Sequence, residues 1–457
     1  MKYRVINSHD VLKVNRFDGS YHNAEVNVYD EIIKSHSDHN LAYYCSTIFT
    51  SGRTRRMYTK QEFGYPFLSN ADVASQNPLS ACNYASKKYS YDETAFLKGG
   101  MILTGRVGAI GQTSFVPKFW ERYGMMGSDN IIRIVVKPEH KNGFIYAYLA
   151  SKVGNLSFWK HATGGVQPFI TDKMVGNLPI PNFPDSFQKE VDDLIQQSAK
   201  LREQSTAKLD EAKRIFENEI GVSTTDYGAY KNEGIAIQSI AGKFKRMDCQ
   251  YQISHKSIVK EKYSLTTTKI NDIAKDIFTG NRGKRNYVEN DGIYFLSSSE
   301  MMLANPKRFC KKISRRTPNL NDLLVMKGNI LISRSGTVGN TILVNNNLNG
   351  CAISEHAMRL VIDEEKIAPE YVFAYFCTKQ GKDSLAILPY GSVIVTLGEE
   401  FLGDVDLPLL PIKTQNRITA LVKEYSKMTD MAIETENKAI TMVEEEIEKW
   451  QSPIAKS

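Results

Sequence analysis

Short runs of branched apolar residues, closed by glycine or asparagine turns, predict β-strands at several places along the chain. Two other segments carry apolar residues three and four positions apart, which predicts short helices. The predicted strands are Asn130–Lys137, Asn329–Ser333, Asn340–Val344 and Ala357–Asp363, and the predicted helices are Phe144–Ser151 and Tyr371–Thr378. The pattern therefore favours an α+β fold with many loops.

Two much longer helices are predicted at the middle and the end of the chain. The first follows Pro184, contains no proline or internal glycine and stops at Gly221. It would be roughly 50 Å long at 1.5 Å per residue. Its counterpart runs from about Thr414 to Trp450. Such helices exceed the diameter of a domain of about 180 residues, so part of each must lie outside its own domain.

Each long helix carries one apolar stripe that needs to be covered. The stripe residues are Val191, Leu194, Leu201, Leu209 and Phe216 in the first helix, and Ile418, Leu421, Tyr425, Met428, Met442 and Ile447 in the second. A core position within a globular domain is the usual explanation for such a stripe. Because the two helices have equal length, we expect them instead to cover one another as an antiparallel coiled coil.

The chain also contains an internal repeat that spans its whole length. The phrase "ILTGRVGAIGQT" (102–113) returns as "ILISRSGTVGNT" (330–341), 228 residues later. With offsets between 226 and 230, "RFDGSY" (16–21) matches "RMDCQY" (246–251), "IFTSGRTRRMY" (48–58) matches "IFTGNRGKRNY" (277–287), and "SDNIIRIVV" (128–136) matches "SEHAMRLVI" (354–362). The predicted organisation is therefore a mixed domain at 1–184, a long helix at 185–220, a second mixed domain at 221–411 and a second long helix at 412–457.

Composition and charge narrow the class of protein. The 457 residues are 42% hydrophobic and 24% charged, which is typical of globular domains. No apolar stretch is long enough to cross a membrane and no signal peptide is evident, so we expect a cytoplasmic protein without a membrane partner. The six scattered cysteines indicate reduced thiols rather than disulfides or zinc. The net charge of +7 is concentrated in the two domains, with 21 basic against 14 acidic residues in 1–184 and 24 against 20 in 221–411.

No catalytic constellation is recognisable in the sequence. The glycine-rich phrases lack the lysine that follows the last glycine of a phosphate-binding loop, so turns between strands explain them better. His36 and His39 have no third ligand nearby and are interpreted as surface histidines. We therefore expect no catalytic residue, no metal and no cofactor.

Basic residues in turn-rich segments point to double-stranded DNA as the partner. Arginine can bind guanine or phosphate, and glutamine and asparagine can read adenine. The basic run 307–316 is equally well explained as a solvated face, but the arginines at 53 and 56 recur at 282 and 285 beside matched tyrosines. The predicted DNA-binding residues are Arg53, Arg55, Arg56, Lys60, Arg106, Gln112, Thr113 and Gln167 in the first domain, and Arg282, Lys284, Arg285, Arg334, Asn340 and Thr341 in the second.

On these residues the chain resembles the specificity (S) subunits of type I restriction-modification enzymes. The phrases that carry the resemblance are "GNILISRSGTVGNT", the openings "RFDGSY" and "RMDCQY", and "LPIPNFPDSFQKEV" and "LPLLPIKTQNRI" at the starts of the long helices. The resemblance implies two target recognition domains alternating with two helical spacers, which bind a bipartite DNA sequence. It also implies two modification (methyltransferase) subunits and, in the full complex, restriction (endonuclease) subunits as partners, with no catalysis or cofactor in this chain.

Two alternatives remain on the residues alone. One is a chain with an unrecognised catalytic activity that modifies DNA. The other is a coiled-coil assembly protein that never binds DNA. The second half departs from the first where "GSVIVTLGEEFLGDVDLP" (391–408) stands in place of "GGVQPFITDKMVGNLPIP" (164–181).

Overall fold

The computed structural model describes residues 8–14, 16, 19, 21–22, 24–53, 55–80, 82–164, 167–221, 265–308, 310–335, 337–391 and 395–450. These fall into two compact units, one formed by residues 1–203 with 431–457 and the other by residues 204–430. The phrase "RMDCQY" and residues 222–264 of the predicted second domain lie outside the described residues, as do Phe17, Asp18 and Ser20 of "RFDGSY".

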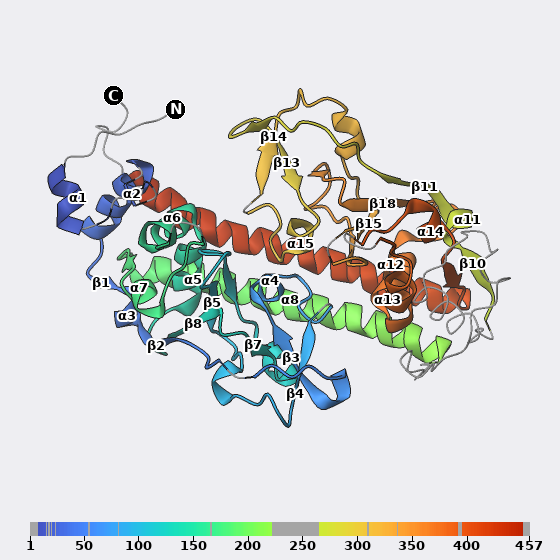
Figure 1. Ribbon diagram of the computed structural model, residues 1–457, viewed down its shortest axis with the longest axis horizontal. Coiled ribbons are helices and arrows are strands. Elements are labelled where there is room, and N and C mark those ends of the chain that lie inside the picture. Colours follow the sequence, from blue (N-terminus) through green and yellow to red (C-terminus); the bar gives the residue numbers. More distant parts are fainter. Residues whose placement is uncertain are drawn as a thin grey trace. The chain divides into compact units, whose positions relative to one another are not determined.

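The first unit combines short helices with three small sheets (Figure 1). Its helices are α1 (Ser8–Val14), α2 (Ala24–Ser35), α3 (Leu41–Tyr44), α4 (Asn70–Val73), α5 (Asn142–Ala150), α6 (Lys152–His161) and α7 (Asp172–Gly176). Its strands are β1 (His39–Asn40), β2 (Cys45–Thr50), β3 (Gly64–Leu68), β4 (Asn83–Ser86), β5 (Ile102–Gly105), β6 (Thr113–Phe115), β7 (Met126–Gly127), β8 (Ile131–Val136) and β9 (Pro179–Ile180).

The described part of the second unit repeats most of this series of elements, without counterparts of α1, α2 and α4 and with one additional strand, β12. Its short helices are α11 (Ile270–Ile273), α12 (Pro369–Cys377), α13 (Lys379–Ala386) and α14 (Glu399–Gly403). Its strands are β10 (Thr267–Lys269), β11 (Ala274–Thr279), β12 (Tyr287–Val288), β13 (Ile293–Leu296), β14 (Lys311–Ile313), β15 (Ile330–Ser333), β16 (Thr341–Leu343), β17 (Ala352–Ile353), β18 (Ala357–Ile362) and β19 (Asp406–Pro408). The α+β fold and every strand and short helix predicted from the sequence are confirmed.

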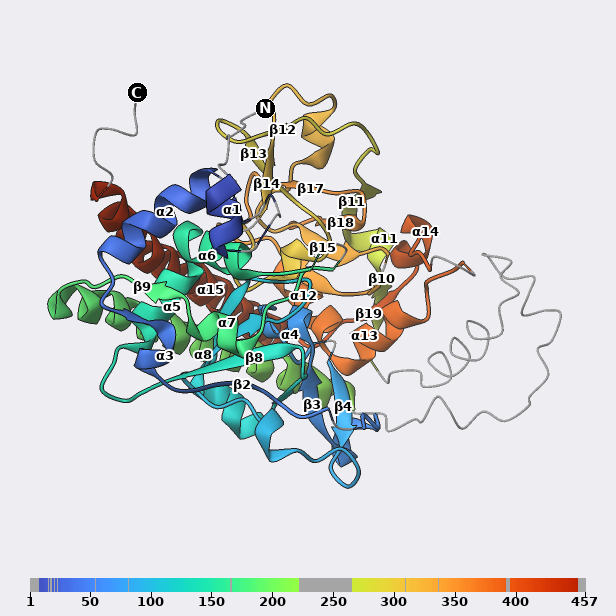
Figure 2. The ribbon, with the colours of Figure 1, turned by 60° about the vertical axis from the view of Figure 1, so that its left-hand side comes forward.

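The main sheets of the two units have the same topology. Their strand orders are β2-β8-β5-β6 and β11-β18-β15-β16, and all of their strand pairs are antiparallel. Even the irregularity in the first strand is shared, because the register shifts between Cys45 and Thr47 in β2 and between Ala274 and Asp276 in β11. A second sheet in each unit contains one parallel pair, β3 with β7 and β13 with β17. In Figure 2 the strands β3 and β4 of the first unit lie side by side.

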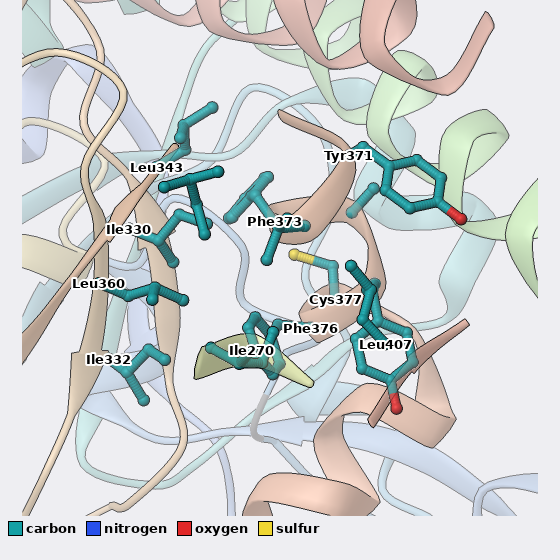
Figure 3. Close-up of a cluster of buried hydrophobic side chains, with 14 of the residues drawn as sticks. Ile270, Ile330, Ile332, Leu343, Leu360, Tyr371, Phe373, Phe376, Cys377 and Leu407 are labelled. Atoms are coloured by element: carbon teal, nitrogen blue, oxygen red, sulfur yellow. The ribbon is translucent and has the colours of Figure 1, made fainter. Parts of the chain in front are cut away.

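Both faces of each main sheet are covered, which explains the continuous apolar runs. Ile330 and Ile332 belong to the core between β15 and the helix α12, whereas Leu331 belongs to the core on the opposite face. Figure 3 shows Ile330, Ile332 and Leu360 of the sheet opposite Phe373 and Cys377. In the first unit, the neighbouring residues Ile102 and Leu103 divide between two cores in the same way. Side chains alternate along a strand, so a strand covered on both sides needs apolar residues at successive positions.

The two long helices are α8 (Asp185–Ile220) and α15 (Ile412–Lys449), drawn green and red in Figure 1. They cover the ranges predicted, except that α15 begins two residues earlier and ends one residue earlier. Gly221, just past the end of α8, has a φ of 78°, the left-handed conformation that closes many helices. Of the predicted stripe, Val191, Leu209, Phe216, Ile418, Leu421, Tyr425 and Ile447 are buried, and Leu194, Leu201, Met428 and Met442 are half-buried.

Polar contacts join the long helices within each unit. In the second unit, Ser205 Oγ lies 2.7 Å from Thr429 Oγ1, Lys208 Nζ lies 2.6 Å from Glu424, and Arg417 donates to Glu211 at 2.9 Å. From one of these contacts to the next, the residue number rises in α8 and falls in α15, so the two helix segments run antiparallel. In the first unit, Ser198 Oγ donates to Ala432 O at 2.8 Å and Arg202 pairs with Glu436.

The segments 164–181 and 391–408, which differ in sequence between the halves, still form matching isolated bridges through their described residues. Phe169 pairs with Thr163 and with Val107 in the first unit, and Thr396 pairs with Tyr390 and with Ser335 in the second. The described backbone at these bridges is thus the same in both units although the sequence has diverged.

Each unit also contains a tight corner between two helices. At the start of α6 the Ser151 hydroxyl accepts from Gly154 N at 3.1 Å, and Thr378 and Gly381 repeat this cap in the second unit. A Cβ atom at either glycine would lie well inside van der Waals distance of the carbonyl oxygen of the preceding helix, on Tyr148 or Tyr375. Only glycine lets the two helices approach this closely.

We predict that Gly154→Ala and Gly381→Ala each lower the free energy of unfolding by about 3 kcal/mol, because the backbone must shift to relieve the clash. The control is Gly176→Ala, whose new Cβ would meet Ala42 Cβ at 3.4 Å, an ordinary contact. Urea unfolding of the three variants beside the parent chain measures the effect. Equal stability of all three variants would contradict the close approach.

Candidate DNA interface

A completely buried arginine organises the turn between β7 and β8. Arg133, in β8, has no exposed surface, and its guanidinium donates to four backbone carbonyls. These belong to Gly127 at 2.6 Å, Ile131 at 2.9 Å, Ala95 at 3.1 Å and Ser128 at 3.3 Å. Three of the four carbonyls lie in the turn 127–131, so the buried guanidinium stabilises the conformation of this turn.

The second unit has the same arrangement around Arg359 in β18. This arginine is also completely buried and donates to the carbonyls of Ile353 at 2.8 Å, Leu323 at 2.9 Å and Ala357 at 3.5 Å. An aromatic ring covers each guanidinium, with Phe49 at 5.9 Å from Arg133 and Phe278 at 5.5 Å from Arg359. Burial lowers the pKa of each guanidinium to about 10, so both remain charged at neutral pH.

Each of these turns carries one acidic residue, which pairs with two arginines of a basic loop. The basic loops are the segments 51–60 in the first unit and 280–285 in the second. In the first unit Asp129 forms ion pairs with Arg56 and with Arg53. The distance from Asp129 Oδ2 to Arg53 Nε is 3.2 Å. In the second unit Glu355 pairs with Arg282 Nε at 3.3 Å and with Arg285 at 3.4 Å. All six residues occupy matched positions of the repeat. The structure therefore brings together the arginines that the sequence singled out, around an acid that it did not.

The two arginines of each cluster differ in their surroundings. Arg56 and Arg285 lie 5.3 Å above the rings of Phe67 and Phe295, and Arg285 also donates to the carbonyls of Asn281 and Gly283 at 2.9 Å. The Arg285 side chain is only 10% exposed, and that of Arg56 is 39% exposed. In contrast, the side chains of Arg53 and Arg282 are 81% and 80% exposed. One arginine of each pair supports the loop, and the other faces solvent.

The Glu355 carboxylate is held in its charged form. Partial burial acts to raise its pKa, but the pKa is nevertheless lowered, because a backbone N–H, His356, Arg282 and Arg285 all favour the charged form. The cluster in the second unit is therefore ionised throughout the neutral range.

Exposed tyrosines stand beside both clusters. Tyr58 is 51% exposed and packs edge-on against Phe67, and Tyr287 is 53% exposed and packs in the same way against Phe295. Lys311 Nζ lies 5.2 Å from the Tyr287 ring. Within the basic run 307–316, Lys307 and Lys312 lie over the ring of Tyr294, so part of this run packs on an aromatic residue.

The remaining predicted DNA-binding residues divide by exposure. Arg55, Lys60, Gln167 and Lys284 are exposed, and Arg106, Gln112 and Asn340 are half-buried. Arg334 uses its side chain internally, donating to Leu397 O at 3.0 Å, and the Thr341 hydroxyl donates to Gly339 O at 3.0 Å. Thr113 is only 4% exposed, because it lies in β6 within the covered sheet. Its side chain is not at the surface, which corrects the expectation of a DNA contact there.

The glycine-rich phrases form turns between strands, as predicted. The first connects β5 to β6 and the second connects β15 to β16. Gly108, Gly111 and Gly339 have φ values of 77°, 74° and 89°, the left-handed region that favours glycine. His36 and His39 lie at the surface, and within the described ranges no group of three or more potential ligands could hold a metal ion.

Sequence reasoning missed Asp129, Glu355, Arg133 and Arg359. The signal was present in the matched phrases "SDNIIRIVV" and "SEHAMRLVI", which keep an acid at the second position and an arginine at the sixth. An arginine within an otherwise apolar strand is unusual, and its retention in both copies could have indicated a buried hydrogen-bonding role.

These features define a protein with two copies of a mixed domain, each of which displays a basic loop that pairs with a turn held by a buried arginine. Residues 264–442 match the family described as the type I restriction modification DNA specificity domain. These residues of the second half thus belong to that DNA specificity family, as the resemblance predicted. The family match does not extend to the first copy. The first copy nevertheless has the same strand order in its main sheet as the second, and the same cluster of one acid with two arginines.

Two solved structures are similar over most of their length. One is the S subunit of the type I restriction-modification system from M. genitalium, with 11% identity, a TM-score of 0.34, and coverage of 90% of this chain and 95% of that chain. The other is the HsdS subunit from Thermoanaerobacter tengcongensis, with 14% identity, a TM-score of 0.30 and the same coverage. No curated protein matches the chain. Among the described helices, none combines the length and apolar character needed to span a membrane.

We predict that Arg133→Met and Arg359→Met each destabilise the protein by about 3 kcal/mol, because they leave buried carbonyls without donors. The matched control is Arg122→Met, since the Arg122 side chain is 76% exposed and pairs with Glu203. Its loss should cost under about 1 kcal/mol. Thermal unfolding followed by circular dichroism distinguishes the two outcomes, and equal melting of all three variants would argue against the buried anchors.

Proposed function

We propose that this chain binds a bipartite DNA sequence, with the basic loop of each copy contacting one half-site. The observation that carries the proposal is the exposed arginine, Arg53 or Arg282, which stands at matched positions in both copies on a preformed cluster. A fixed guanidinium that faces solvent is suited to the edge of guanine or to a phosphate. The alternative of an assembly protein that does not bind DNA offers no reason for this duplication of exposed charge.

Two half-sites give the selectivity that one domain would lack. A base contact contributes about 1–3 kcal/mol of discrimination, which is small against the number of competing sites in a genome. We therefore assign 1–184 and 221–411 as two target recognition domains, whose contributions multiply when both are engaged.

The long helices are proposed as the spacers between these domains, at 185–220 and 412–457. At 1.5 Å per residue, the 36 residues of α8 extend roughly 54 Å. With 3.4 Å per base pair, such a length limits the separation of half-site centres to about sixteen base pairs. A separation near one turn of the DNA helix fits this limit comfortably.

The chain itself is proposed to be non-catalytic. The family that it matches is a DNA specificity domain, and the chemistry would come from two modification (methyltransferase) subunits and, in the full complex, from restriction subunits. Since its ligand is chromosomal or invading DNA, we place the complex in the cytoplasm. A catalytic activity within this chain is the second candidate, and no feature of the described residues favours it.

We predict that Arg53→Ala combined with Arg282→Ala weakens binding of the assembled complex to its target DNA by at least about tenfold, since two base or phosphate contacts are lost. The matched control is Arg122→Ala with Arg417→Ala, because these arginines are also exposed and also pair with single carboxylates. Electrophoretic mobility at low and moderate salt measures the affinities. Unchanged affinity of the first double variant would mark Arg53 and Arg282 as ordinary surface charges.

We further predict that the two domains and the spacer can be altered separately. Replacing residues 1–184 by the corresponding domain of another specificity subunit should change one half of the recognised sequence only. Deleting seven residues from both long helices in register should shorten the gap by about three base pairs, because it removes roughly 10 Å. Long-read sequencing of methylated genomic DNA reports both. A graft that changes both halves, or a deletion that leaves the gap unaltered, would refute the assignment.

A further inference from the structure

The geometry of the arginine–carboxylate pairs indicates more than attachment of a loop. In both copies the acid contacts the exposed arginine through Nε, at 3.2 Å between Arg53 and Asp129 and at 3.3 Å between Arg282 and Glu355. Within the described part of the chain, neither terminal amino group of Arg53 or Arg282 has a hydrogen-bond partner. The supporting arginines, Arg56 and Arg285, contact the same acids through a terminal amino group instead.

This geometry leaves the outer end of each exposed guanidinium available. A guanidinium has five N–H donors in one plane, and its two terminal amino groups are spaced to bind O6 and N7 of guanine together. A carboxylate on Nε holds that plane in one orientation, so less rotational freedom is lost when a base is bound. The acid is itself held in place, because Arg133 or Arg359 fixes the turn that carries it.

We propose that Asp129 and Glu355 are positioning residues that orient Arg53 and Arg282 for end-on recognition of a guanine, one in each half of the target sequence. The proposal rests on the proposed function and adds a base identity and a specificity role to it. The carboxylate also disfavours non-specific contacts, because an arginine that turns toward a phosphate brings the acid close to DNA of like charge. The two acids thus favour base reading over binding to the DNA backbone.

The repeat provides a conservative exchange within the molecule itself. The first copy uses aspartate and the second uses glutamate at the matched position, so either acid is compatible with the cluster. Asp129→Glu should therefore retain the discrimination of the parent chain, whereas Asp129→Asn should lose it. The matched control is Glu203→Gln, which removes a carboxylate from an exposed arginine, Arg122, outside the basic loop.

The experiment uses the full chain assembled with its modification subunits. The target sequence is first obtained by methylome sequencing, and affinities are then measured for target duplexes with one base pair changed at a time and for a scrambled duplex. Arg53→Lys should relax one guanine position in one half-site by at least about fivefold, because lysine keeps the charge but loses the paired donors. Asp129→Asn should relax the same position and bind the scrambled duplex more tightly, and the double variant should relax it no further. Arg282→Lys and Glu355→Gln should do the same in the other half-site.

The possible results separate the two proposals. If Asp129→Asn and Glu355→Gln weaken binding to all duplexes equally, the acids only maintain the fold and this inference is wrong. Relaxation at a base other than guanine, or at a position that differs from that of the arginine variant, would also overturn it. If Arg53→Lys and Arg282→Lys change no affinity at all, the basic loops do not read bases and this inference is wrong. The assignment of the loops to DNA fails as well only if Arg53→Ala combined with Arg282→Ala also leaves the affinity unchanged. Should Asp129→Asn not fold, the Glu355→Gln arm and the Asp129→Glu exchange decide the question.

Discussion

A buried guanidinium that must be satisfied by backbone carbonyls is the constraint on which the rest of this interface depends. Arg133 and Arg359 are completely covered, and a charge in such a position is tolerated only when hydrogen bonds replace its water. Because most of those bonds go to the turn before β8 or β18, they stabilise the observed conformation of that turn. The acid at its tip is then fixed, and so are the two arginines that bind it.

The cluster divides two functions between residues of one type. Arg56 and Arg285 lie against phenylalanine rings and stabilise the loop, whereas Arg53 and Arg282 face solvent. The frame is the same in both copies, but the lysine–tyrosine pairs near it differ, with Lys87 on Tyr65 in the first copy and Lys311 on Tyr287 and Lys312 on Tyr294 in the second. Under the proposed function, a constant frame with variable neighbours would allow each copy to read a different half-site.

Much of the fold could be predicted from the sequence because it depends on local pattern. Continuous apolar runs predict β8, β15 and β18, and the absence of proline and glycine predicts α8 and α15. The basic loops were also recognised, since they repeat in register. The individual DNA contacts were less predictable. Thr113 belongs to a phrase that recurs in both halves, yet its side chain is buried, because this part of the phrase forms strand β6 of the covered sheet.

The sequence by itself determined the duplication, the two long helices and the pair of arginine-rich loops, because these follow from periodicity and from residue types within short windows. Only the tertiary structure decided which arginine of each loop is exposed and which acid it contacts. Arg53 and Asp129 are 76 residues apart, and their meeting depends on how β2, β7 and β8 pack. Charge is a property of a residue, but exposure and orientation belong to the packed fold. For that reason the candidate DNA contacts became specific only when the strands were placed beside one another.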